Sequence, residues 1–178
     1  MSAAEPVTDL LARERDNLLA TFTRVPEAHR AVRPSAGAWS ALEILEHCAR
    51  VEGGVAKLLA MRADQPLTAT AEEASAGTLT EGKVRAVRTR AEKLAAPERV
   101  QPTGTLSVDA VMQQAAASRA ALLGAYAATP DAVLDGAVHP HPFIGPLTLR
   151  AWVQLIAHHD ARHAEQMGEV AGHWASAT

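Results

Sequence analysis

The chain is poor in cysteine, in aromatic residues and in long apolar runs, and each shortage excludes a class of protein. The single cysteine, Cys48, cannot form a disulfide within the chain, and such a composition suits a reducing compartment. No apolar run approaches the roughly 20 residues that a transmembrane helix needs. The first residues also lack the basic and then apolar pattern of a secretory signal. We therefore expect a cytoplasmic protein with no membrane partner.

Charge and composition argue against a nucleic-acid-binding protein and favour a helical one. The net charge is −3 and both signs are scattered, so the sequence has no basic stripe of the kind that binds nucleic acid. Hydrophobic residues make up 48% of the chain but aromatic residues only 3%, so the apolar content is mostly alanine, leucine and valine. Alanine and leucine favour helices. The 178 residues are enough for one domain, residues 1–178, with a sizeable core.

Apolar residues recur at helical spacing in four long segments. The predicted helices cover residues 5–24, 40–62, 107–128 and 149–172, with a shorter one at 81–96 and a loop at 64–80. Ser40 and Glu43 have the spacing of a capping box, and Ser107 and Thr148 can cap two later helices. No segment alternates convincingly, so no sheet is expected, and residues 139–146 read as turns. The pattern predicts an all-α four-helix bundle with a long crossover connection.

Three histidines carry the chemistry. His159 and His163 lie four residues apart, so a helix places both imidazoles on one face, one turn apart. They are in phase with apolar neighbours and should point toward the core, as should His47 on the helix at 40–62. Neutral imidazole is a common ligand for zinc and nickel, and three protein ligands leave one coordination position open. We predict a divalent metal site formed by His47, His159 and His163.

A second interpretation needs no metal. Histidines that point inward are often hydrogen-bonded core residues. In a purely structural protein, His47, His159 and His163 could all have this role. His158 should point about a quarter-turn away from His159, toward the surface. His139 and His141 precede the last helix and are interpreted as solvent-exposed loop residues, although either could reach the site.

Few other residues are candidates for catalysis. Glu43 lies one turn before His47 and is the candidate general base, although the capping box also needs its carboxylate. Arg50 and Arg162 could bind the acidic groups of a thiol cofactor, or could form ordinary surface salt bridges. Gln166 could face the site or a neighbouring helix.

The order of these motifs resembles the DinB-like superfamily over nearly the whole chain. The resemblance rests on Trp39-Ser40-x-x-Glu43-Ile44-x-x-His47, His141-Pro142-x-x-Gly145-Pro146-Leu147-Thr148, Trp152, and His159-Asp160-x-x-His163-x-x-Gln166-Met167, and takes in Ala96-Pro97 and Pro102-x-Gly104. Met167 departs conservatively from the isoleucine or leucine usual there. The resemblance implies a DinB/YfiT-like bundle, often a homodimer, in which the same three histidines hold zinc or nickel.

The activities that the resemblance implies are varied. Related branches include S-transferases that use bacillithiol or mycothiol, mycothiol-dependent maleylpyruvate isomerases and proteins described as metal-dependent hydrolases. Our leading hypothesis is a metal-dependent enzyme, a thiol-dependent transferase or a hydrolase, acting on a small-molecule substrate. The alternative is a non-catalytic stress-response protein that binds a metal or ligand. The motifs do not distinguish these activities.

Overall fold

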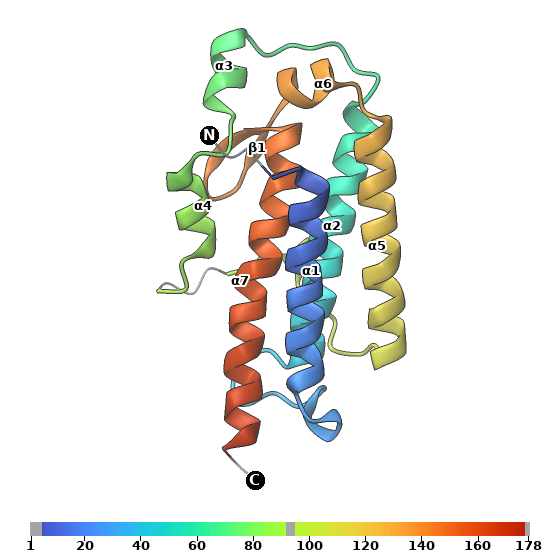
Figure 1. Ribbon diagram of the computed structural model, residues 1–178, viewed down its shortest axis with the longest axis vertical. Coiled ribbons are helices and arrows are strands. Elements are labelled where there is room, and N and C mark those ends of the chain that lie inside the picture. Colours follow the sequence, from blue (N-terminus) through green and yellow to red (C-terminus); the bar gives the residue numbers. More distant parts are fainter. Residues whose placement is uncertain (1–4, 92–94, 177–178) are drawn as a thin grey trace.

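Four long helices lie side by side in the computed structural model, which describes residues 5–91 and 95–176 (Figure 1). They are α1 (Val7–Arg24), α2 (Ala41–Arg62), α5 (Val108–Ala128) and α7 (Leu149–Ala175). Helix α2 packs along α5 and also against α7, and α7 packs along α1. The predicted all-α four-helix bundle is therefore confirmed.

The long connection between α2 and α5 determines how the helices run. Figure 1 shows that α2 and α5 run in the same direction, while α1 and α7 run in the opposite one. Two neighbouring helices can be parallel only if the chain between them returns along the bundle. Residues 63–107 make this crossover, so the crossover expected from the sequence is present.

Side-chain caps explain where three of the long helices begin. Ser40 accepts a hydrogen bond from the Glu43 backbone N–H, and the Glu43 carboxylate accepts one from the Ser40 N–H, which completes the predicted capping box. Ser107 and Thr148 cap α5 and α7 in the same way from the N-cap position. Helix α7 continues to Ala175, three residues beyond the predicted end.

The crossover differs from the prediction in two places. Its first half contains a helix that was not predicted, and the predicted helix in its second half is shorter. The predicted loop at 64–80 includes a short helix, α3 (Ala71–Ala76), which Thr70 caps in a second capping box. The predicted helix at 81–96 is wrong in its length, because α4 (Glu81–Arg88) ends where Thr89 adopts extended backbone. Residues 92–94 lie outside the described residues, and a short 3₁₀ helix, η2 (Glu98–Val100), follows.

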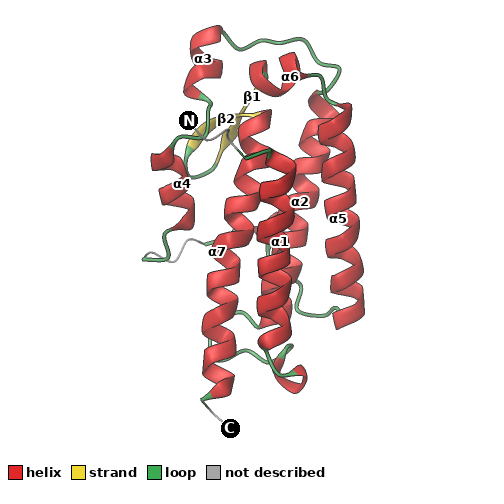
Figure 2. Ribbon diagram, in the orientation of Figure 1, coloured by secondary structure: helices red, strands yellow, loops and turns green. Residues whose placement is uncertain are grey.

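The absence of a sheet was predicted wrongly. After a short helix, α6 (Asp131–Gly136), strands β1 (Val138–His141) and β2 (Gly145–Thr148) form an antiparallel hairpin (Figure 2). Pro140 pairs with Pro146, and proline is tolerated here because both strands of a two-stranded sheet are edges. The strands have four residues each and include prolines, and their burial does not alternate, so the sequence carries no strand signal. The hairpin places residues 138–148 beside the start of α7.

The interior of the bundle has two apolar regions with a charged layer between them. One region contains Leu11, Leu59, Leu122 and Ile156, and the other contains buried residues from the opposite ends of the same helices. Each long helix supplies at least one polar or charged residue to the layer between them. These residues are Arg15, Glu52, Ser118, Arg119 and Asp160. Among the described residues, no helix is both long and apolar enough to cross a bilayer.

Candidate metal centre

The three predicted histidines come together between α2 and α7. His47, His159 and His163 each offer a ring nitrogen, and these atoms all lie within 4.8 Å of one another. The Nε2 atoms of His47 and His159 are 3.2 Å apart. Tetrahedral zinc with nitrogen ligands at 2.0–2.1 Å holds those ligands about 3.3 Å apart. The spacing of the two imidazoles therefore fits a shared divalent cation.

Hydrogen bonds at Nδ1 orient two of the rings. His47 Nδ1 lies 2.7 Å from the carbonyl oxygen of Val100 in η2, and a carbonyl can only accept, so Nδ1 donates. His163 Nδ1 likewise donates to Oε1 of Gln166 at 2.8 Å. A neutral ring that donates from Nδ1 keeps a free electron pair on Nε2. Both rings are thus held in the tautomer that binds a metal through Nε2, by the kind of partner that metal-binding histidines usually have.

Burial keeps all three imidazoles neutral. It lowers the pKa of His47 and lowers that of His159 well below the ordinary value, with the neighbouring imidazoles adding to the effect at His159. Burial and His47 lower the pKa of His163 to about 3. A metal ligand must be deprotonated, so these rings are in the binding form at neutral pH.

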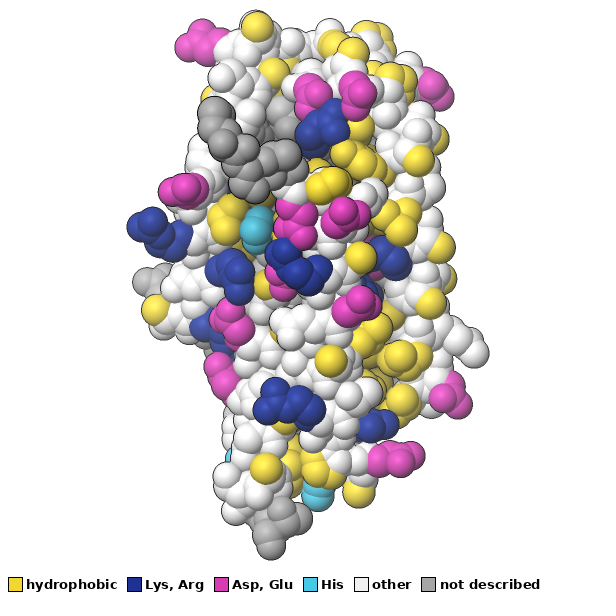
Figure 3. Space-filling view, in the orientation of Figure 1, with side chains coloured by type: hydrophobic (Ala, Val, Ile, Leu, Met, Phe, Trp, Pro, Cys, Tyr) yellow, Lys and Arg dark blue, Asp and Glu magenta, His cyan; other side chains and the backbone are white. Residues whose placement is uncertain are grey.

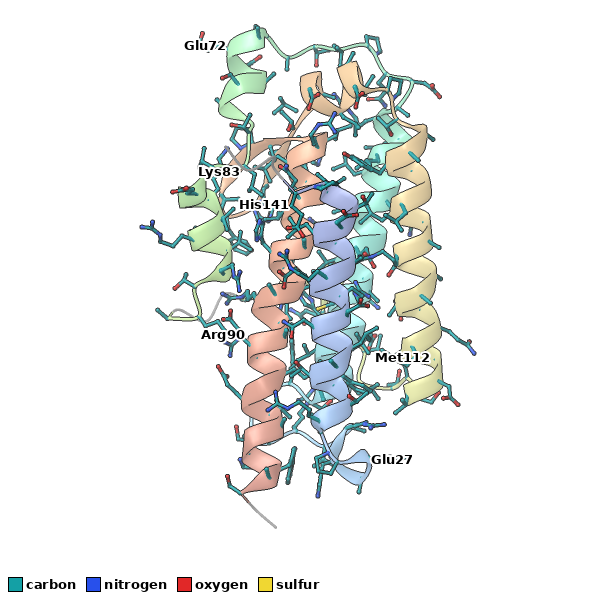
Figure 4. The ribbon with its side chains drawn as sticks, viewed as in Figure 1. Glu27, Glu72, Lys83, Arg90, Met112 and His141 are labelled. Atoms are coloured by element: carbon teal, nitrogen blue, oxygen red, sulfur yellow. The ribbon has the colours of Figure 1, made fainter. Side chains whose placement is uncertain are left out.

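The three histidines line a cavity of about 960 Å³. Its walls come from α2, α4, α7, the hairpin and the segments around residues 34–39 and 95–100. The ion pair of Arg88 with Glu165 holds helix α4 against α7, and that of Arg90 with Glu169 holds the segment just after α4 there. Figure 4 labels Arg90 below α4, beside α7. Figure 3 shows basic side chains over this part of the surface.

The charged lining of this cavity is mostly basic. Among the described lining residues, Lys57, Arg90, Arg99 and Arg162 carry positive charge and Glu169 carries negative charge. Glu169 is already paired with Arg90. The remaining excess of positive charge, in a protein with a net charge of −3, favours an anionic ligand in the cavity.

Comparison with known proteins agrees with this fold. The family model described as the DinB superfamily matches residues 10–167, which include all three histidines and all four long helices over most of their length. The chain belongs to the DinB superfamily. The resemblance seen in the sequence motifs is thereby confirmed.

Two relatives of this DinB-superfamily chain extend the comparison. The uncharacterized protein YuaE of Bacillus subtilis (strain 168) is 28% identical over 139 residues, which cover 78% of this chain and 80% of YuaE. The crystal structure of TT2238, a four-helix bundle protein, is similar with a TM-score of 0.61 and 23% identity, over 92% of this chain and 96% of that one. At that identity the structural likeness supports the fold alone.

The other predicted candidates lie in different places. The Glu43 carboxylate is held by the capping box and by Arg33, and it lines a separate pocket near Gly104 rather than the histidine cavity. Arg50 donates to the Arg99 carbonyl and does not line the histidine cavity either. Arg162 does line the cavity and donates to the Val87 carbonyl. Gln166 faces the site, where it orients His163. Glu43 is therefore not proposed as a base.

Two histidines that we interpreted as loop residues belong to the cavity of this DinB-superfamily protein. His139 and His141 are two positions apart on β1, so they share one face of the hairpin, and both line the cavity with Trp152. Their ring centroids lie 6.1 and 4.9 Å from that of Trp152. Their spacing is that of a strand, and it was missed because no strand was expected.

A second group of possible ligands lies next to the first but is already engaged. Cys48, His159 and Asp160 also offer donor atoms within 4.8 Å of one another. The Asp160 carboxylate accepts hydrogen bonds from Arg15 and Arg119, and burial raises the pKa of the Cys48 thiol well above its usual value. Neither group is free to bind a cation, so the three histidines form the better site.

Proposed function

We propose that this protein is a metal-dependent enzyme in which His47, His159 and His163 hold one zinc or nickel ion. The observation that carries the proposal is the arrangement of Nε2 atoms, 3.2 Å apart for His47 and His159, with Nδ1 of His47 and His163 held by acceptors. A hydrogen bond between His47 and His159 would account for the contact of those two rings, but it would not require a ring nitrogen of His163 to lie within 4.8 Å of both.

The cavity gives such a site a place for a substrate. A cation bound by three imidazoles supplies Lewis-acid chemistry, which generates a hydroxide or thiolate nucleophile near neutral pH. Trp39 and Trp152 line the cavity with apolar surface, against which an apolar part of a substrate would pack. Arg162 lines it beside the histidines and would bind an anionic group of the substrate or of a thiol. This basic lining supports the thiol-dependent transferase slightly over the hydrolase.

The alternative is a non-catalytic stress-response protein that binds a metal or ligand. A protein that bound only the metal would keep the histidine site but would not need a large cavity open to it, whereas a ligand-binding protein would need both. The volume of about 960 Å³ adjoining the histidines therefore favours the enzyme over a protein that binds only the metal. A purely structural role for the histidines would predict that no metal binds.

Metal content per chain is the decisive test. The tag-free protein, purified without chelator and then offered zinc or nickel, is expected to retain about one ion per chain by mass spectrometry. His47→Ala and His163→Ala should lose it, because two ligands do not hold the ion as tightly as three. His158→Ala is the matched control, since His158 is not among the residues lining the cavity. Equal metal content in all four proteins would refute the site.

The reaction requires a separate screen. The metal-loaded protein would be assayed for transfer of bacillithiol or mycothiol to electrophiles and for hydrolysis of small esters and amides, with His163→Ala as the blank. Turnover that depends on metal supports the enzyme, whereas metal binding without turnover of either kind supports the binding protein. The homodimer and the cytoplasmic location remain predictions, which analytical ultracentrifugation and cell fractionation would test.

A further inference from the structure

The hairpin holds His141 in the opposite tautomer to that of His47 and His163. The backbone N–H groups of Phe143 and Ile144 both point at Nδ1 of His141, at 3.2 and 3.4 Å. An N–H can only donate, so Nδ1 must be the acceptor and carry no proton. The proton of the neutral ring is then on Nε2.

The ring is kept neutral and in place by its surroundings. Burial lowers the pKa of His141 to about 4. Trp152 packs against the ring at a centroid distance of 4.9 Å, and Phe143 lies on another side at 5.9 Å. Trp152 is itself tied to the hairpin, because its indole N–H donates to the carbonyl of His139. His141 therefore presents a fixed hydrogen-bond donor, which is not in the form needed to bind a metal.

The Nε2 atom of His141 has no hydrogen-bond partner among the described residues and is not buried. The residue lines the same cavity as the three histidines, and Figure 4 labels it between α4 and α7, beside the hairpin. An N–H group without a partner, on a residue that lines a cavity, is available to a ligand there.

The distance between the two ends of the cavity sets the size of that ligand. Trp152, which contacts His141, precedes His159 by seven residues on α7, or about 10 Å along the helix. The wall between them is apolar and consists of Val51, Val55 and Leu58 from α2 and Leu155 and Ile156 from α7. A ligand that spans the cavity therefore needs a metal-binding group at one end, an apolar middle and a polar far end.

We propose that His141 is a specificity-determining residue, and that its Nε2–H binds a carbonyl or similar acceptor at the end of an elongated small molecule whose other end reaches the three histidines. The proposal rests on the proposed metal site for the second contact only. It assigns the substrate class as an amphipathic molecule with an acceptor on the order of 10 Å from its metal-binding atom.

The tautomer can be tested without any ligand or metal. In protein labelled with ¹⁵N at histidine, long-range ¹H–¹⁵N spectra at pH 7 should show His141 with a bare Nδ1 and a protonated Nε2, assigned by its loss in His141→Gln. His47 and His163 should show the opposite tautomer. A proton on Nδ1 of His141 would overturn the proposal, whether or not the protein binds metal.

The ligand contact is tested with two thiols of equal length. In cobalt-loaded protein, the thiolate–cobalt absorption gives the affinity of 8-mercaptooctanamide and of 1-octanethiol, which lacks an acceptor. The amide is neutral, so Lys57 and Arg99 do not attract it by charge. The ratio of the amide affinity to the octanethiol affinity should be about 3- to 10-fold higher in wild type than in a variant without the donor, the usual value of one neutral hydrogen bond.

Three variants separate the outcomes. His141→Phe should lower this affinity ratio while it keeps its affinity for octanethiol, and His141→Gln, which retains a terminal N–H donor, should keep the wild-type ratio. His158→Phe is the control. An unchanged ratio in His141→Phe would overturn the role of His141 while leaving the metal site intact. Failure to bind cobalt would refute the proposed function instead. The NMR measurement of the tautomer would then be the test of His141, because it needs no metal.

Discussion

His47 and His159 are 112 residues apart in the chain, yet their Nε2 atoms lie 3.2 Å apart. Helix α2 supplies the first ring and α7 the second, and these helices pack directly against each other. The Nδ1–H of His47 is bound by Val100 of the crossover, so a third segment of the chain fixes the ring that α2 provides. Several predictions about binding and stability depend on such contacts between distant segments.

Replacing Gln166 should weaken metal binding although the residue is not a ligand. Gln166→Leu removes the acceptor for Nδ1–H of His163 and frees that ring to rotate. Loss of such a partner typically costs about 10- to 100-fold in metal affinity, which competition with a chromophoric chelator would measure. Gln154→Leu, on the same helix but not among the residues lining the cavity, is the control. An unchanged affinity in Gln166→Leu would show that the contact does not orient His163.

The buried charged layer should be far more sensitive to substitution than the surface ion pairs. Asp160→Asn leaves Arg15 and Arg119 with one buried carboxylate, Glu52, between them. Breaking a buried pair on one side typically costs about 3–5 kcal/mol of stability. Glu165→Gln, which breaks the exposed pair with Arg88, should cost less than about 1 kcal/mol. Urea denaturation measures both, and similar losses would contradict this account of the charged layer.

Acidification should destabilise the metal-free protein below about pH 6.5. Burial holds the pKa of His141 at about 4 and that of His163 at about 3 in the folded state. As the pH falls, the unfolded chain therefore binds protons at these positions before the folded protein does. This lowers the free energy of unfolding. Asp160 acts in the opposite direction, because burial raises its folded pKa to about 6 and the folded protein takes up that proton first.

His141→Phe isolates one of these contributions. The variant cannot gain a proton at this position on unfolding, so its free energy of unfolding should fall less steeply between pH 7 and pH 5 than that of wild type. Urea titrations at several pH values, with chelator present, measure the two slopes. Identical slopes would mean that His141 titrates normally in the folded protein.

Gly54 and Gly77 should respond oppositely to alanine. A Cβ atom at Gly54, in the middle of α2, would meet nothing within 4 Å, so Gly54→Ala should stabilise the helix by roughly 0.5–1 kcal/mol. A Cβ atom at Gly77 would lie 3.0 Å from the backbone nitrogen of Thr148, which also donates to the Gly77 carbonyl. Gly77→Ala should therefore destabilise the contact between the crossover and β2. Thermal denaturation measures both, and a destabilised Gly54→Ala would contradict the open space seen beside α2.

Local patterns were enough to predict much of the bundle. Apolar spacing and the side chains of Ser40, Ser107 and Thr148 defined the starts of three long helices, because a cap acts over three residues and needs no distant partner. The spacing of His159 and His163 likewise placed them on one face, since the helix repeat alone determines it.

Other features depended on contacts between segments far apart in the sequence. The two four-residue strands pair with each other, and neither Pro140 nor Pro146 favours a strand by itself. Glu43 has the spacing of a base beside His47, but Arg33 and the Ser40 N–H hold its carboxylate away from the cavity. The charged layer was equally hard to predict, because four helices must pack before its charges meet. Its residues are Arg15, Glu52, Arg119 and Asp160.

The sequence by itself determined the four long helices, the caps of three of them and the inward face that His159 and His163 share, because these follow from residue spacing within one helix. Only the tertiary structure decided that His47 meets His159, that Val100 binds the ring of His47, and that His141 lines the same cavity. The physical reason is that each of these contacts joins separate segments, and their energies appear only when packing brings those segments within hydrogen-bond distance.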